Sequence, residues 1–180
     1  MSSSAPPVPE GLYWFQPRTK PLVRELRDAG DRVIGTLRDL PKPAITWMFT
    51  DPMRARAEVG SSAWDLSIER KGISGFFGFS ATVFIDAGRT GTLEAGPFIT
   101  KGMLTLATGR RLKWNGGFFE GPSSFHDEAG RMLVKFRSGS YFKRVNSYVV
   151  VQPEAAEMSE WPLLAVFGMY LRLLMNRVFE

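Results

Sequence analysis

The stretch that most constrains the fold is an apolar run near the carboxyl end, within residues 160–178. From Trp161 to Leu171 it contains no charged residue, so a helix over this run has no polar face at a period of 3.6 residues. Pro162 fits the first turn of such a helix, where its missing N–H costs no hydrogen bond. A helix that is apolar all round must be buried, either in protein or in lipid.

The length of the run decides between these two environments. Residues 161–175 would span about 22 Å at 1.5 Å per residue, against about 30 Å for the hydrocarbon core of a bilayer. Arg172 and Arg177 shorten the apolar part further. We therefore predict a core helix over residues 160–178, around which the preceding chain is wrapped. The alternative is a short membrane anchor whose two arginines reach the lipid interface.

Most of the preceding chain has the pattern of β-strands. In residues 54–59 small apolar side chains alternate with charged ones, and in residues 64–69 large apolar side chains alternate with polar ones. Such alternation indicates strands with one buried and one solvated face, as in antiparallel sheets. Ala55 and Ala57 would leave interior space for a bulky element such as the helix. Residues 12–15 are a short aromatic cluster. Further strands are predicted at residues 22–27, 32–38, 44–50, 76–85, 89–94, 103–107, 111–114, 123–126, 131–137 and 147–152.

Three of the predicted connections share one turn pattern, in which an aspartate is followed by a glycine two or three residues later. They are Asp28–Gly30, Asp86–Gly88 and Asp127–Gly130. The aspartate can accept hydrogen bonds from the backbone and the glycine can adopt a positive φ, so each pattern predicts a hairpin. Around the first turn a helix over residues 21–29 is the competing interpretation, because two leucines lie four residues apart.

These elements predict a mainly β fold, an antiparallel closed barrel of about 10–12 strands wrapped around one central hydrophobic C-terminal α-helix. Closure removes the sheet edges and provides one axial interior for one apolar helix. We assign residues 12–180 to this single barrel domain. Residues 1–11 have no basic region and no apolar run, so we expect a disordered leader rather than a signal peptide.

The charge of the chain is unevenly distributed. The formal net charge is +5, but residues 101–149 alone carry nine basic residues against three acidic ones. This excess permits an anionic partner such as a phosphate or a lipid headgroup, although the charge by itself favours a merely solvated strand face. The candidate headgroup ligands lie next to Trp114, Tyr141 and Phe142, as in surfaces that combine cations with aromatic rings. They are Arg110, Arg111, Lys113, Lys143 and Arg144.

Few residues suggest catalytic chemistry. The only histidine, His126, precedes Asp127, and such a pair could orient an imidazole for general-base catalysis. Its place beside a predicted turn favours a structural or solvent-exposed role. The chain has no cysteine, no clustered metal ligands and no phosphate-binding glycine loop. We therefore predict no enzyme, and no catalytic, cofactor-binding or metal-binding residue. The lack of cysteine is compatible with the cytoplasm.

The apolar helix over Trp161–Met175 and the three Asp-to-Gly turns give the chain a resemblance to the tubby C-terminal-like superfamily. This group includes the tubby domain, the phospholipid scramblases and the plant LURP-one-related proteins. The resemblance covers roughly residues 12–180 and is closest to the LURP-one-related or scramblase-like branch. It implies a twelve-stranded barrel around a central hydrophobic helix. It also implies contact with membrane lipid, since tubby domains bind phosphoinositide headgroups through basic side chains.

The chain departs from the scramblases at their Asp-rich calcium segment. Only Glu154, Glu157 and Glu160 stand before the helix, so the sequence does not predict calcium-driven activity. We expect a monomeric, non-catalytic, cytoplasmic domain that associates peripherally with anionic membrane lipid. The alternative is a structural or protein-interaction module with no lipid ligand. We expect no specific binding of nucleic acid.

Overall fold

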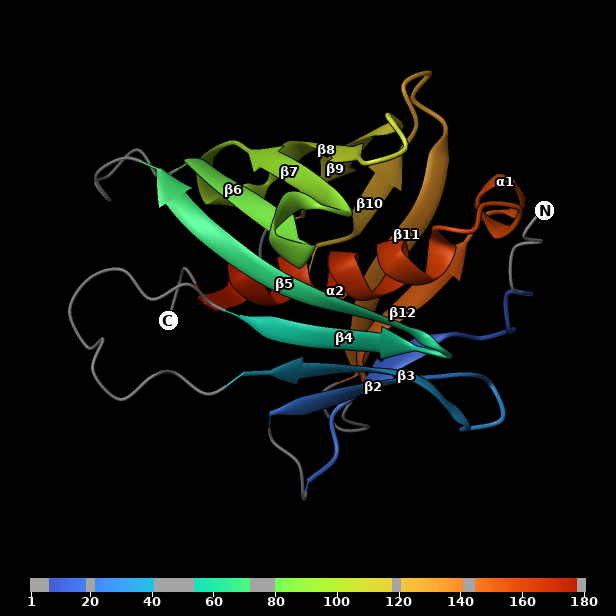
Figure 1. The fold of residues 1–180 in the computed structure, drawn as a ribbon. Helices are drawn as coiled ribbons and strands as arrows, with labels where there is room; N and C mark the ends of the chain where they lie inside the picture. The colour runs from blue at the N-terminus through green and yellow to red at the C-terminus, as the bar shows by residue number, and fades with distance from the viewer. Residues whose placement is uncertain are drawn as a thin grey trace.

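Twelve antiparallel strands form a closed barrel in the computed structural model, which describes residues 7–18, 22–40, 54–71, 80–117, 121–140 and 145–177 (Figure 1). Each strand pairs with the next along the chain, and β1 closes the barrel against β12 through Tyr13 and Tyr148. The prediction of a closed barrel around a C-terminal helix is confirmed. The strands are β1 Tyr13–Phe15, β2 Val23–Arg27, β3 Val33–Asp39, β4 Ala55–Val59, β5 Ser62–Lys71, β6 Ser80–Ile85, β7 Gly91–Ala95, β8 Lys101–Leu106, β9 Arg111–Asn115, β10 Ser123–His126, β11 Met132–Ser140 and β12 Val145–Val151.

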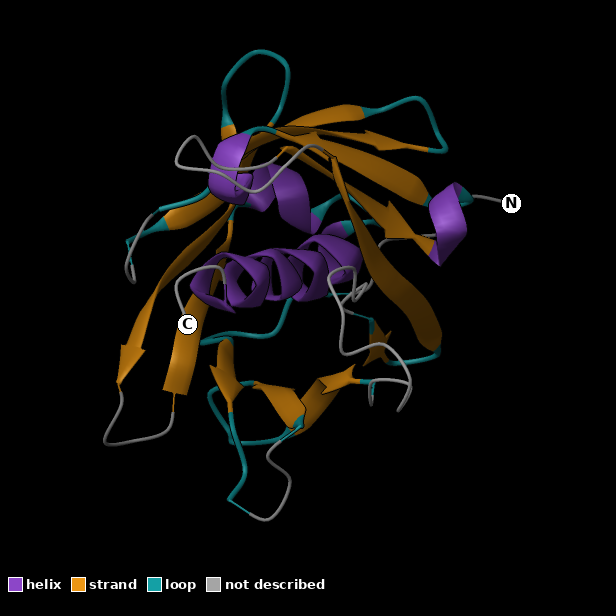
Figure 2. Cartoon of the chain, turned by 90° about the vertical axis from the view of Figure 1, so that its left-hand side faces the viewer, coloured by secondary structure: helices purple, strands orange, loops and turns teal. Residues whose placement is uncertain are grey.

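The helix α2, Trp161–Arg177, runs through the barrel, and the short helix α1, Pro153–Ala156, precedes it (Figures 1 and 2). Every residue of α2 from Trp161 to Met175 is buried. The prediction of a core helix is thus confirmed and the anchor alternative is wrong, because the strands cover the surface that lipid would have to contact. None of the helices in the described residues is long and apolar enough to cross a membrane.

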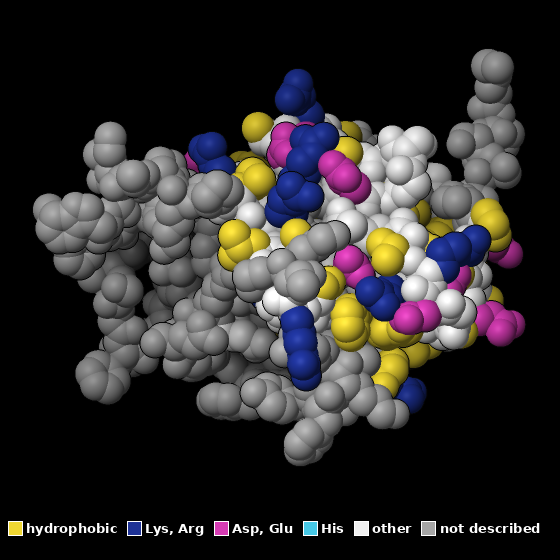
Figure 3. Space-filling view, turned by 90° about the horizontal axis from the view of Figure 1, so that it is seen from below, with side chains coloured by type: hydrophobic (Ala, Val, Ile, Leu, Met, Phe, Trp, Pro, Cys, Tyr) yellow, Lys and Arg dark blue, Asp and Glu magenta, His cyan; other side chains and the backbone are white. Residues whose placement is uncertain are grey.

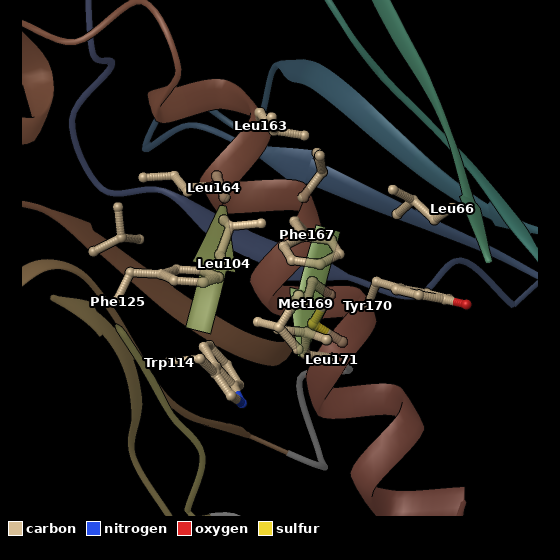
Figure 4. Packing of buried hydrophobic residues seen from close by; sticks show 14 of the residues in the cluster. Leu66, Leu104, Trp114, Phe125, Leu163, Leu164, Phe167, Met169, Tyr170 and Leu171 are labelled. Carbon is tan, nitrogen blue, oxygen red and sulfur yellow. The ribbon is translucent and has the colours of Figure 1, made fainter. Parts of the chain in front are cut away.

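The inner face of the barrel is shaped to admit α2. Ala55 and Ala57 on β4 are fully buried, and α2 packs against this strand. On the other side, aromatic rings fill the space around the helix (Figure 4). Phe167 of α2 stacks on Phe125 of β10 with ring centroids 6.3 Å apart, and Trp114 of β9 lies 4.8 Å from the same ring of Phe125. Small residues on one side and rings on the other therefore set the position of the helix.

At Gly168, α2 lies close against the barrel wall. A Cβ atom added there would lie 2.2 Å from Cζ of Phe136 and 3.1 Å from Cε2 of Phe125. Both rings are fully buried, so neither can move into solvent.

We expect Gly168→Ala to lower the free energy of unfolding by about 1–3 kcal/mol, the usual cost of overpacking a core. Helix propensity alone would have the opposite effect on stability, because it favours alanine over glycine by about 1 kcal/mol. Urea denaturation measures the change. Ala165→Gly in the same helix is the comparison, since it loses helix propensity together with one buried methyl group. A Gly168→Ala protein as stable as the parent would contradict the close contact.

The predicted strands and turns agree with the structure where both exist. All three Asp-to-Gly turns join paired strands, namely β2 to β3, β6 to β7 and β10 to β11. The competing helix over residues 21–29 is wrong, because β2 occupies residues 23–27. In this segment the leucine spacing is outweighed by pairing on both sides, with β1 and with β3. The predicted strand at residues 44–50 and the start of that at 76–85 lie outside the described residues.

Arg24 and Asp39 form an ion pair on the inner face of the barrel. Arg24 and Asp39 alternate in phase with the buried residues Leu26 and Leu37, and their relative exposures are 8% each. The guanidinium of Arg24 donates to Asp39 Oδ2 at 3.2 Å. A single buried charge carries a large desolvation cost, so the pairing of Arg24 with Asp39 stabilises both charges in the interior.

Candidate anion-binding face

Basic side chains gather on the outer surface of β8, β9 and β11. Along β9, the buried residues Leu112 and Trp114 alternate with the exposed residues Arg111 and Lys113. The same alternation turns Lys101 of β8 outward, together with Lys135 and Arg137 of β11. We call the outer surface of β8–β11 that carries Lys101, Arg111, Lys113, Lys135 and Arg137 the basic face.

The strand register brings these cations together. Lys101 pairs with Asn115, Asn115 with Ser124, and Ser124 with Lys135. Since neighbouring strands lie about 4.8 Å apart, the Cα atoms of Lys101 and Lys135 are separated by about 14 Å. Arg111 and Lys113 follow one another along the same side of β9, about 7 Å apart. The basic face is therefore continuous, with only uncharged polar side chains and Met103 between its cations.

No acidic residue occurs on the strands β8 to β12. Among the residues that the structure describes, no carboxylate forms an ion pair with any of the five cations. Lys113 donates from Nζ to the main-chain oxygen of Glu128 at 3.1 Å, which leaves its charge in place. The basic face is thus a region of positive potential.

The opposite side of the barrel is different. Over β2 and β3, basic and acidic side chains adjoin one another (Figure 3). Arg27 binds both Glu25 and Asp31, and Arg32 binds Asp28 at 3.0 Å. These ion pairs neutralise most of the charge of the described side chains over β2 and β3, whereas the five cations of the basic face have no described carboxylate partner.

The structure places the five predicted headgroup ligands differently. Arg111 and Lys113 lie on the basic face. Arg110 lies in the turn before β9 and pairs with Glu160 at 3.2 Å. Lys143 and Arg144 lie outside the described residues, and the strand ends next to them, Ser140 and Val145, are at the other end of the barrel from Arg111.

Two aspects of the sequence interpretation need correction. Trp114 is not a surface ring beside the cations, because it points inward, is 1% exposed and donates from Nε1 to the carbonyl of Ile99 at 2.8 Å. Conversely, Lys101, Lys135 and Arg137 were not among the predicted ligands. Their alternation with buried residues in each strand predicts that they point outward. That they share one surface follows only from the pairing register of β8 to β11, which the sequence does not give.

The outer surface of β8–β11 bears no Phe, Tyr or Trp side chain. Among the described residues, an exposed ring next to this surface belongs to Tyr148 of β12, the cross-strand partner of Arg137, which is 40% exposed. Single-stranded nucleic acid is usually held by basic grooves that also provide aromatic platforms for the bases. Within the strands that the structure describes, the basic face therefore provides positive charge but no aromatic platform for bases.

His126 is bound on both ring nitrogens. Nδ1 lies 3.1 Å from the carbonyl oxygen of Gly130, which can only accept, so Nδ1 carries the proton. Nε2, 2.8 Å from Ser124 Oγ, then accepts from that hydroxyl. The carboxylate of Asp127 binds Arg131 instead, through Nε at 2.7 Å and the main-chain N–H at 2.8 Å. Partial desolvation raises the pKa of Asp127, but these hydrogen bonds outweigh it, so its pKa lies below the ordinary value. His126 and Asp127 thus both stabilise the turn between β10 and β11 through their hydrogen bonds.

No family model, no curated protein and no solved structure matches this chain. Its function is therefore inferred from the charge and geometry of its own surface.

Proposed function

We propose that this chain is a non-catalytic barrel domain that associates peripherally with membranes containing anionic lipid, through the basic face. The observation that supports the proposal is the set of five outward cations on β8, β9 and β11, with no carboxylate on these strands and no ion pair to a described residue. Phosphate-bearing headgroups provide the complementary charge.

The expected affinity is modest and depends on salt. A basic residue near an anionic membrane contributes about 1 kcal/mol, so five contribute at most about 5 kcal/mol. The interaction weakens as the Debye length falls from about 10 Å at 0.1 M salt to about 3 Å at 1 M. Such binding is reversible. It requires no inserted helix, and the apolar helix α2 is buried in the core of the domain.

Co-sedimentation with vesicles tests the proposal. The full chain should pellet at low salt with vesicles that contain anionic lipid, and should stay in the supernatant with neutral vesicles. The triple variant Lys101→Glu, Lys113→Glu, Lys135→Glu should bind at least about 100-fold more weakly, because each substitution removes an attraction and adds a repulsion of similar size.

A matched control separates the basic face from net charge. The variant Arg38→Glu, Arg54→Glu, Arg89→Glu changes the charge of exposed positions elsewhere by the same amount. It should retain most of the binding. If both triple variants bind equally, or if the parent does not bind anionic vesicles at low salt, the proposal fails. The alternative, a structural or protein-interaction module without a lipid ligand, would then be favoured.

We include membership of the tubby C-terminal-like superfamily and a cytoplasmic location in this proposal. The support for membership is the order of elements, with the barrel strands first and an enclosed apolar helix after them. The support for the location is electrostatic, because the anionic leaflet that attracts basic surfaces faces the cytoplasm.

A further inference from the structure

A strip of uncharged side chains borders the basic face where the barrel closes. The two strands that meet at this seam, β12 and β1, contain no charged residue. On β12, Tyr148 and Val150 alternate with the buried residues Ser147 and Val149, and so point outward. On β1, Tyr13 points outward opposite Tyr148, and the two ring centroids are 6.4 Å apart. We call Tyr13, Tyr148 and Val150 the seam strip.

The strand register joins the seam strip to the basic face. Arg137 pairs with Tyr148 and Lys135 pairs with Val150, so each of these cations of β11 adjoins an uncharged side chain of β12. Tyr148 is 40% exposed, so its ring is open to contact from outside. The Cα atoms of Arg137 and Tyr13 are about 10 Å apart across the three strands. Cations and exposed ring surface are thus presented together on one side of the barrel.

Carboxylates limit the seam strip on its other side. Tyr13 pairs with Arg27 of β2, whose guanidinium lies 4.2 Å from the ring centroid of Phe15 and binds both Glu25 and Asp31. The hydroxyl of Tyr13 donates a hydrogen bond to the same carboxylate of Asp31. Two carboxylates against one guanidinium repel an anionic surface, whereas the cations of β11 attract it. The edge of a contact with anionic lipid therefore falls between β1 and β2.

We propose that the seam strip enters the headgroup region of the membrane when the basic face binds anionic lipid, with Tyr148 as its main contact. This inference rests on the proposed function and adds the orientation of the domain on the membrane. Tyrosine suits this region because its ring is apolar while its hydroxyl stays hydrated. Each strand takes about one twelfth of the circumference of the closed barrel, so β11 and β12 face the bilayer together while β3 and β4 turn away from it.

A lipid surface fits the seam strip better than a second protein does. The strip consists of three side chains, whereas a specific protein interface usually involves about 20–30 residues on each side. In a symmetric dimer formed through this surface, the same patch of both copies would be in contact. The cations Lys135 and Arg137, which have no described carboxylate partner, would then face their own copies, and like charges repel. Anionic headgroups provide the opposite charge instead.

Co-sedimentation with anionic vesicles over a series of salt concentrations tests the inference. Tyr148→Ser should weaken binding about three- to tenfold at each salt concentration, because it removes apolar surface and no charge. The triple glutamate variant of the basic face should instead lose the salt dependence itself. Tyr148→Trp should bind at least as tightly as the parent, since tryptophan is also enriched at membrane interfaces.

Val33→Ser is the matched control. Val33 is 45% exposed and lies on the same cross-strand row as Tyr148 and Tyr13, but beyond Arg27 and its carboxylates. Its substitution should leave binding unchanged. An equal loss in Val33→Ser and Tyr148→Ser would assign the effect to exposed apolar surface in general and overturn the inference.

A fluorescent label reports the orientation directly. The chain has no cysteine, so Tyr148→Cys and Val33→Cys each provide a single attachment site for a polarity-sensitive dye. With anionic vesicles at low salt, the emission of the dye at position 148 should shift to the blue as the dye leaves water, and the emission of the dye at position 33 should not. The lack of a shift at position 148, in a protein that pellets with the vesicles, would overturn the inference.

The proposed function and this inference can be told apart by their failures. A parent chain that does not pellet with anionic vesicles overturns both. A parent that pellets, with Tyr148→Ser binding equally well at every salt concentration, overturns the orientation alone. Size-exclusion chromatography without vesicles tests a second copy as the occupant. A parent dimer that Tyr148→Ser abolishes would place the seam strip between two copies and overturn the inference.

Discussion

A chain that ends at Met158, and so lacks α2, will not fold. Fifteen consecutive residues, from Trp161 to Met175, are buried in the barrel. Burial of each large apolar side chain contributes about 1.5–3 kcal/mol, and a whole domain has a net stability of only about 5–15 kcal/mol. Loss of the helix would leave the inner faces of all twelve strands around an empty interior.

Circular dichroism and urea titration measure this outcome. The full chain should show a cooperative transition without detergent, and the shortened chain should show none and should aggregate. Phe167→Ala provides an intermediate case, since it removes one fully buried ring from the same helix and should cost about 3–5 kcal/mol. A shortened chain that is soluble and cooperative, beside a full chain that needs detergent, would contradict the enclosed helix.

The second large effect is expected at the inner ion pair. Asp39→Ala should lower the free energy of unfolding by about 3–5 kcal/mol, because it removes a carboxylate that pairs with the buried guanidinium of Arg24. Equilibrium denaturation in urea measures the loss.

Two comparisons show whether the loss comes from the buried charge. Arg24→Met combined with Asp39→Leu removes both charges at similar volume and should recover most of the stability. Glu58→Ala breaks an ion pair with Arg56 whose side chains are about half exposed, and should cost less than about 1 kcal/mol. If the double variant is no more stable than Asp39→Ala, the pair does not act through its charge.

The sequence predicts the fold well because the fold depends on local patterns. The lack of charge from Trp161 to Leu171 requires burial, and alternation in β4, β5 and β9 identifies the inner side of each strand. The hairpin turns follow from the aspartate, whose carboxylate in Asp28 accepts from the main-chain N–H groups of Gly30 and Arg32. Each of these signals lies within a few residues.

The candidate sites were less predictable because they join distant segments. Arg110 and Glu160, which pair, are 50 residues apart in the sequence, and no local pattern predicts their contact. Arg110, Asp127 and Glu160 come from the β8–β9 turn, the β10–β11 turn and the segment after β12, which become neighbours only when the strands from β8 to β12 pair. Trp114 was open to prediction, since it alternates with Arg111 and Lys113, but proximity in sequence suggested a shared surface instead.

The order of the elements also sets the order of events during synthesis. The ribosome makes all twelve strands before it makes α2, and the closing pair of strands joins Tyr13 to Tyr148. At about 5–20 residues per second, the growing chain spends several seconds with the apolar sides of its strands uncovered. Pairing between such distant segments is also slow. A nascent chain of this design therefore depends on protection from aggregation until its last helix emerges, and acquires its stability in one late step.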